Sequence, residues 1–230
     1  MKIKKKENVC IIPARGGSKR IPLKNIKKFQ GVPIIVRSIK KAISSKLFDK
    51  IIVTTDNKQI ANLAKKNGAQ IHIRSKKLSD DYTDTISVIK NVIEKLNYKK
   101  IHFKKVCCIY PTSIFYDFSD LKKGLKMLSK KRDYIFSAIK YDHPVYRSFI
   151  KKEKKLKMVF SGMEKKRTQD LPKTYYDAAQ FYFGWKSSWE KRKKIFDKKS
   201  DFVEISKYKS QDLDEPSDWI YAERLWRLKN

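Results

Sequence analysis

The feature that most constrains the fold is a regular alternation of short apolar runs and amphipathic segments through the first 140 residues. Apolar runs lie at residues 9–14, 50–56, 70–74, 105–112 and 134–141. Segments with helical spacing of apolar residues lie between them, at residues 33–44, 57–69, 83–96 and 119–131. Strands that alternate with helices pack as a mostly parallel sheet covered by helices on both faces. The sequence therefore predicts an α/β, doubly wound, Rossmann-like fold, and 230 residues suit a single domain over 1–230.

The alternation stops between residues 142 and 176. This stretch is too polar to form a core and too long for an ordinary loop, so it is either a functional arm or a disordered insert. We interpret residues 140–173 as an inserted arm of the single domain. Apolar runs return at residues 178–185 and 201–207 and indicate two further strands.

The chain closes with a segment typical of a helix. Pro216 suits the first helical turn. Helical spacing predicts that Ile220, Leu225 and Leu228 face inward together with the tryptophans of this segment.

The charge is strongly basic, with 56 Lys and Arg against 24 Asp and Glu and a net charge of +32. The lysines are spread along every segment instead of forming one stripe, which favours a solvated surface over a nucleic-acid footprint. No apolar run is long enough for a signal peptide or a membrane span, and the 3 cysteines lack metal-site spacing. We expect a cytoplasmic protein with reduced thiols, no membrane association and no specific nucleic-acid partner.

The first apolar run breaks into the sequence "ARGGSKRIPLKN", residues 14–25. Glycines let a backbone approach a ligand and turn its N–H groups toward anionic oxygens, while nearby cations offset the charge of a phosphate chain. The loop lacks both the Walker A ending and the G-x-G-x-x-G pattern. On its own, it predicts either a phosphate-binding loop or a plain basic turn.

Two aspartates, Asp212 and Asp214, precede the last helix. Carboxylates at i and i+2 of an extended segment point to the same side, so both could hold one divalent cation. Capping of the helix that follows is the alternative interpretation.

The loop resembles the amino-terminal signature of the cytidylyltransferases that activate nonulosonic acids as CMP-sugars. The resemblance extends to the end of the chain and implies a nucleotide-diphospho-sugar transferase fold. It implies that Arg15, Lys19, Asp212 and Asp214 serve catalysis, with Mg²⁺ held by the two aspartates. The segments Thr55–Asp56 and Thr83–Thr85 match places that line the nucleotide pocket in that family. The residues implied to bind CTP are Ala14, Arg15, Gly16, Ser18, Lys19, Lys24, Asn25, Arg74 and Thr85.

The second substrate is implied to be a nine-carbon acidic sugar. "CCIYPTSIF", "RTQDL" and "YYDAAQFYFG" resemble the pseudaminic acid branch more than the sialic acid branch. The arm packs on a second subunit in that family, which implies a homodimer. The residues implied to bind the sugar are Tyr110, Arg147, Arg167, Gln169 and Gln180.

The implied reaction is transfer of CMP from CTP to the anomeric hydroxyl of a nonulosonic acid, with release of pyrophosphate. Pseudaminic acid is the favoured acceptor, and sialic or legionaminic acid is the alternative. A basic nucleic-acid-binding protein on a degenerate nucleotidyltransferase fold is the alternative from another class, since it would use the net charge directly.

Overall fold

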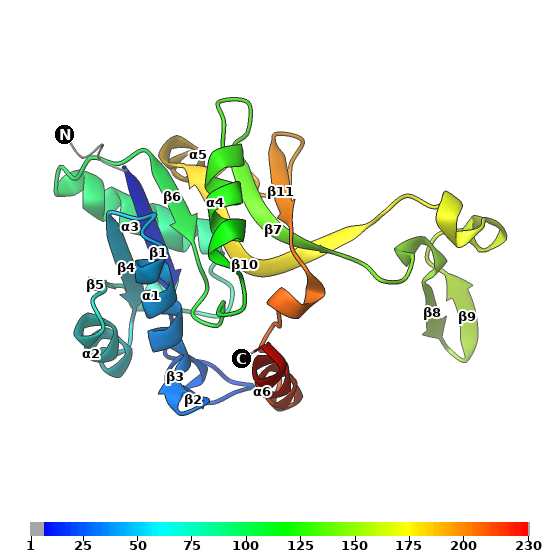
Figure 1. Cartoon of the computed structure of the whole chain (residues 1–230), viewed down its shortest axis with the longest axis horizontal. Helices are drawn as coiled ribbons and strands as arrows, with labels where there is room; N and C mark the ends of the chain where they lie inside the picture. Colours follow the sequence, from blue (N-terminus) through cyan, green and yellow to red (C-terminus); the bar gives the residue numbers. More distant parts are fainter. Residues whose placement is uncertain (1–6, 230) are drawn as a thin grey trace.

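A computed structural model describes residues 7–229 and shows one seven-stranded sheet between helical layers (Figure 1). The strand order is β11-β7-β10-β6-β1-β4-β5. These strands are β1 (Asn8–Pro13), β4 (Lys50–Thr55), β5 (Gln70–Ile73), β6 (Lys105–Cys108), β7 (Tyr134–Lys140), β10 (Tyr175–Trp185) and β11 (Ser200–Glu204). The doubly wound α/β prediction is confirmed.

Parallel pairing dominates the sheet around β1. β1 pairs in parallel with both β4 and β6, and β4 pairs in parallel with β5. The antiparallel exception is β10, which lies between β6 and β7. The carboxyl ends of β1, β4, β5 and β6 therefore meet at one edge, where open α/β sheets bind ligands.

Helices cover both faces of this sheet. One face is packed by α1 (Ile34–Ser44), α2 (Lys58–Lys66) and α4 (Phe118–Met127). The other is packed by α3 (Thr85–Tyr98) and the short α5 (Lys186–Glu190). The Asn57 side chain caps α2 by accepting from the Gln59 and Ile60 N–H groups. Within residues 7–229, no helix combines the length and the apolar character that a membrane crossing needs.

A third apolar cluster lies beside the sheet, where α6 (Pro216–Lys229) meets the hairpin of β2 (Lys28–Phe29) and β3 (Val32–Pro33). Phe29 is its centre and contacts the Trp219 ring edge to face at 5.6 Å between centroids. Pro216 begins α6, as predicted.

The inward face predicted for α6 is partly wrong. Leu225 is buried, but Ile220 and Leu228 are 55% and 86% exposed. Trp219 is buried as predicted, and Ala222 is buried beside it, because these two residues share the helix side of Leu225 that meets Phe29.

The arm is an ordered structure. Between β7 and β10 the chain extends away from the sheet and forms a hairpin of β8 (Phe149–Lys152) and β9 (Lys155–Met158) (Figure 1). Its turn residues, Glu153 and Lys154, both have positive φ, 50° and 65°. Such a two-residue turn matches the right-handed twist of the strands it joins.

A bulge interrupts β10 where the strand reaches the carboxyl edge. The register with β7 shifts between Asp177 and Tyr182, and Ala179 has a φ of 51°. The Ala179 N–H donates to the Asp177 carboxylate at 3.0 Å, and its carbonyl accepts from the Ser113 hydroxyl at 2.8 Å. Bulges of this kind re-aim side chains next to active sites.

Ala179→Gly should stabilise the protein by about 0.5–1 kcal/mol, because glycine adopts a left-handed conformation without the cost that a Cβ imposes. Chemical denaturation of both proteins measures the free energy of unfolding. Ala178→Gly is the matched control, since Ala178 is buried in the same bulge without a positive φ, and it should be destabilising. A loss of stability in Ala179→Gly would contradict the strained bulge.

Candidate active site

A cavity of about 360 Å³ opens at the carboxyl edge of the sheet. Its walls come from the loop after β1, the segment between β5 and α3, the residues after β6, the β10 bulge and the segment before α6. The residues predicted from sequence that line it are Arg15, Ser18, Lys19, Lys24, Asn25, Arg74, Thr85, Tyr110, Asp212 and Asp214.

The glycine loop after β1 is held against β4 and α2. The Gly16 N–H donates to the Asp56 carboxylate at 2.9 Å, so this donor faces the protein and not the cavity. A Cβ at Gly16 would lie 2.9 Å from the Asn57 Cβ, which explains why glycine stands there. Ala14 is buried, and its N–H donates to the Thr54 carbonyl at 2.9 Å. Ala14 and Gly16 therefore support the loop from behind.

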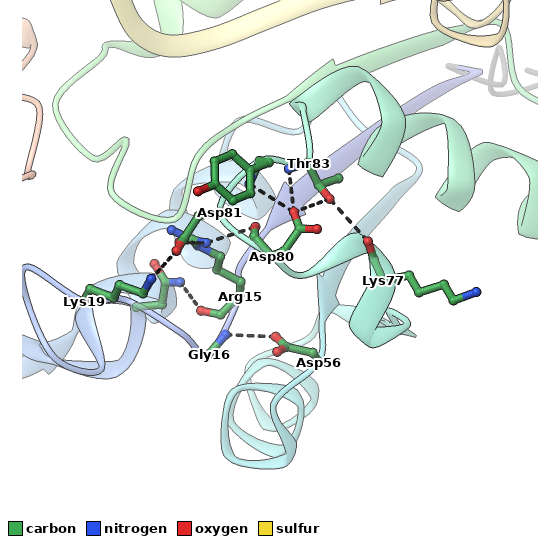
Figure 2. A network of polar contacts seen from close by, with 10 residues as sticks. Arg15, Gly16, Lys19, Asp56, Lys77, Asp80, Asp81 and Thr83 are labelled. Atoms are coloured by element: carbon green, nitrogen blue, oxygen red, sulfur yellow. Dashed lines mark hydrogen bonds and ion pairs between the residues drawn. The ribbon is translucent and has the colours of Figure 1, made fainter.

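Two cations of the loop lie against one carboxylate. Figure 2 shows the Asp81 side chain between Arg15 and Lys19. The Lys19 Nζ lies 2.5 Å from Asp81 Oδ2, and the Arg15 guanidinium contacts Asp81 Oδ1. Hydrogen bonds from Lys19 and Arg15 hold the pKa of the Asp81 carboxyl below its ordinary value. Arg15 also donates to the Asp80 carbonyl at 3.0 Å.

Arg74 follows β5 and is 6% exposed. Its backbone N–H donates to the Thr55 carbonyl at 2.9 Å, but the side-chain Nε and Nη2 are buried without a hydrogen-bond partner. Burial lowers the pKa of Arg74. A buried guanidinium with unmet donors is costly in free energy unless a ligand supplies acceptors.

The Asp-x-Asp segment meets the basic loop from the far end of the chain. The Asp214 carboxylate pairs with Arg20 at 3.0 Å and with Lys24 at 3.4 Å. The Lys24 Nζ also donates to the Leu213 carbonyl at 2.6 Å. The pKa of Asp212 is raised by desolvation and then by the neighbouring charge of Asp214. A cation that binds beside Asp212 would favour its charged form and so oppose this rise in pKa.

Asp218, in the first turn of α6, fixes this segment. Its Oδ2 accepts from the N–H groups of Asp214 at 3.0 Å and Glu215 at 2.7 Å. The capping expected near this helix is therefore made by Asp218, which leaves the carboxylates of Asp212 and Asp214 on the cavity wall. No cluster of three or more Asp, Glu, His or Cys suited to a metal ion occurs within residues 7–229. Two carboxylates on the cavity wall fit Mg²⁺, which takes few protein ligands and completes its shell with phosphate and water. A bound cation would compete with Arg20 and Lys24 for the Asp214 carboxylate.

A second hollow of about 500 Å³ shares Thr85 and Tyr110 with the cavity. The Thr85 hydroxyl is 2.8 Å from the Tyr110 hydroxyl, and Tyr110 packs edge to face on Tyr182 at 5.6 Å. The Tyr182 hydroxyl donates to the Asp177 carboxylate. Burial raises the pKa of Tyr110, and desolvation raises the pKa of Asp177. Thr85 and Tyr110 thus form the wall between the two hollows, and Asp177 and Tyr182 line the second hollow.

The other residues predicted to bind sugar lie apart from the cavity. Gln180 is 2% exposed; its Nε2 donates to the Ala178 carbonyl and the Ser210 hydroxyl, while its Oε1 has no partner. The arm residue Arg147 lines a hollow of about 700 Å³ near the start of the arm. Arg167 pairs with Asp170 at 2.8 Å, and Gln169 is exposed.

Sequence reasoning missed Asp81, Asp177 and Asp218. One signal was available for Asp81, because the doublet "DD" at residues 80–81 is unusual in a chain with 24 acidic against 56 basic residues. Asp177 gave no such signal, since only the β10 bulge turns it toward Tyr182.

Comparison with known proteins agrees with this fold. A solved structure of CMP:2-keto-3-deoxy-manno-octonic acid synthetase complexed with CTP superposes with a TM-score of 0.72, at 12% identity, over 97% of this chain and 99% of that chain, which shows the same fold. Pseudaminic acid cytidylyltransferase of Campylobacter jejuni subsp. jejuni serotype O:23/36 (strain 81-176) is 36% identical over 227 residues, covering 97% of this chain and 98% of that protein.

A third relative is the Helicobacter pylori (strain ATCC 700392 / 26695) protein named pseudaminic acid cytidylyltransferase and UDP-2,4-diacetamido-2,4,6-trideoxy-beta-L-altropyranose hydrolase. It is 34% identical over 208 residues, which cover 89% of this chain and 40% of that longer protein. The cytidylyltransferase family model matches residues 9–225. The resemblance predicted from the loop is therefore confirmed, and the chain belongs to the cytidylyltransferase family.

Proposed function

We propose that this protein transfers CMP from CTP to the anomeric hydroxyl of a nonulosonic acid, with pseudaminic acid the favoured acceptor, and releases pyrophosphate. The observation that carries this function is the Arg74 guanidinium, buried in the cavity wall with two donors unmet. Such a group needs acceptor atoms from a ligand. The relatives named for pseudaminic acid support the choice of acceptor.

The cations of the loop supply charge stabilisation. Arg15 and Lys19 lie on the cavity wall, where they would offset the charge that develops on the departing pyrophosphate. Transfer of a phosphoryl group depends mostly on positioning and on electrostatic stabilisation. Lys24 and Asn25 would fix the nucleotide while they hold the loop, since the Asn25 Nδ2 donates to the Arg15 carbonyl at 2.9 Å.

Asp212 and Asp214 would hold the divalent cation. Their oxygen donors and the raised pKa of Asp212 suit Mg²⁺. When bound, this ion supplies Lewis-acid polarisation of the phosphate and lowers the pKa of the attacking hydroxyl. Asp218 keeps the segment in place through its bonds to the backbone of Asp214 and Glu215.

The acceptor sugar would lie toward Tyr110 and the second hollow. Tyr110 belongs to both hollows, so a substrate that extends from the cavity meets its hydroxyl. A guanidinium fork from Arg147 or Arg167 suits the sugar carboxylate, because it offers two parallel donors.

We further propose that the arm reaches a second copy of the chain. Three apolar side chains of the hairpin, Phe149, Ile150 and Leu156, are each more than half exposed. Phe149 and Leu156 lie on one face of the hairpin and Ile150 lies on the other, because side chains alternate along a strand. Exposed apolar side chains of this kind are found on interaction surfaces. A homodimer would cover them and would bring Arg147, Gln169 and Arg167 toward the partner's sugar site.

The acceptor is tested by pyrophosphate release from CTP and Mg²⁺ with pseudaminic, legionaminic and N-acetylneuraminic acids offered separately. We expect the highest kcat/KM with pseudaminic acid. A higher kcat/KM with legionaminic or N-acetylneuraminic acid would mean that the acceptor is the alternative one and not pseudaminic acid. No release with any of the three, from folded protein, would contradict the function.

Asp212→Asn should abolish turnover and yet stabilise the metal-free protein at pH 7. The pKa of Asp212 is raised in the folded state, so its protonated form is favoured there. The stabilising contribution of protonated Asp212 is therefore fully present below the ordinary aspartate pKa of about 3.9. It is lost as the pH rises through the raised pKa of the folded state, so the charged Asp212 destabilises the protein at pH 7. The increase in the free energy of unfolding of Asp212→Asn over the wild type should therefore vanish near pH 3.

Denaturant titrations with a chelator at both pH values measure this gain, beside the pyrophosphate assay. Glu94→Gln is the control, because Glu94 is an exposed carboxylate of α3 paired with Lys90 and should change neither quantity. An active Asp212→Asn protein, or one less stable at pH 7, would contradict the cation site.

A further inference from the structure

The Asp81 carboxylate occupies the place that the proposed function gives to the phosphates leaving as pyrophosphate. Figure 2 shows it between the side chains of Arg15 and Lys19. These are the cations closest in sequence to the glycine loop, and both lie on the cavity wall. One internal carboxylate therefore contacts both of these cations and offsets one of their two positive charges.

The loop that presents Asp81 is anchored on both sides. Before it, the Asp80 carboxylate accepts from the N–H groups of Tyr82 at 3.0 Å and Thr83 at 2.7 Å. After it, the Asp84 side chain caps α3 by accepting from the Ser87 N–H at 2.8 Å. Asp81 lies between these anchors with its side chain about one-third exposed. The anchors keep the carboxylate close to the cations, and its exposure leaves it a path to water.

We propose that Asp81 is a specificity-determining residue that competes with the β- and γ-phosphates of CTP for Arg15 and Lys19, an inference that rests on the proposed function. CTP and pyrophosphate supply the charge needed to displace the carboxylate. CMP and a CMP-sugar lack those phosphates and leave Asp81 in place. After transfer, return of Asp81 to the two cations favours release of pyrophosphate.

The size of this competition follows from the exposure of the pairs. Ion pairs in contact with solvent contribute little each, because water screens them and the side chains lose freedom. Two such pairs correspond to about a three- to tenfold change in affinity. A triphosphate can overcome an effect of this size on affinity, and the effect is still large enough to discriminate between ligands with and without the β- and γ-phosphates.

Calorimetric titration of the whole chain in the presence of Mg²⁺ tests the competition, with CTP, inorganic pyrophosphate and CMP as separate ligands. Asp81→Asn should bind CTP and pyrophosphate about three- to tenfold more tightly than the wild type, with no change for CMP. Its affinity for CTP should also fall more steeply with salt, because the uncovered cations gather counterions that binding must release.

Two matched variants complete the design. Asp81→Glu keeps the charge and should restore wild-type affinities. Glu94→Gln removes one exposed carboxylate from α3 and measures the effect of net charge alone.

Unchanged or weaker binding of CTP and pyrophosphate by Asp81→Asn would overturn the competition, as would an equal gain for CMP. A wild-type protein that binds neither CTP nor pyrophosphate would overturn the proposed function, and the role of Asp81 with it.

Discussion

Parallel pairing of β1 with β4 and β6 is the constraint on which the site depends. It brings the carboxyl ends of these strands to one edge, so the loop that bears Arg15 and the residues around Tyr110 face the same cavity. β5 adds Arg74 to this edge through its pairing with β4. Without this pairing, the chemistry-bearing residues would lie far apart, since they come from separate parts of the chain.

Two charged groups around the cavity lower the stability of the folded protein. Arg74 is buried with unmet donors, and Asp212 has a raised pKa beside Asp214. Both arrangements oppose folding and both are relieved by ligands of the opposite charge. Arg15 and Lys19 are exposed to solvent and pair with the Asp81 carboxylate, which in our proposal the phosphates of CTP displace. Local costs of this kind are expected at functional sites of otherwise consistent folds.

Much of this could be predicted from sequence because it depends on local patterns. The strand predicted at residues 9–14, observed as β1 (Asn8–Pro13), follows from periodicity, and the helix that begins at Pro216 follows from proline geometry. The exposure of Ile220 and Leu228 could not be predicted, because the side of α6 that is buried is selected by contact with Phe29, which lies far away in the chain. The position of Asp81 likewise depends on tertiary contacts. The family signature identified the basic loop, but it does not specify which carboxylate meets it.

The most direct test of the account is an experimental structure of the protein with CTP and Mg²⁺ bound. We expect the β- and γ-phosphates against Arg15 and Lys19, the cation between Asp212 and Asp214, and the donors of Arg74 bonded to the nucleotide. A nucleotide bound outside this cavity, or an Arg74 guanidinium that still lacks a partner with CTP in place, would contradict it.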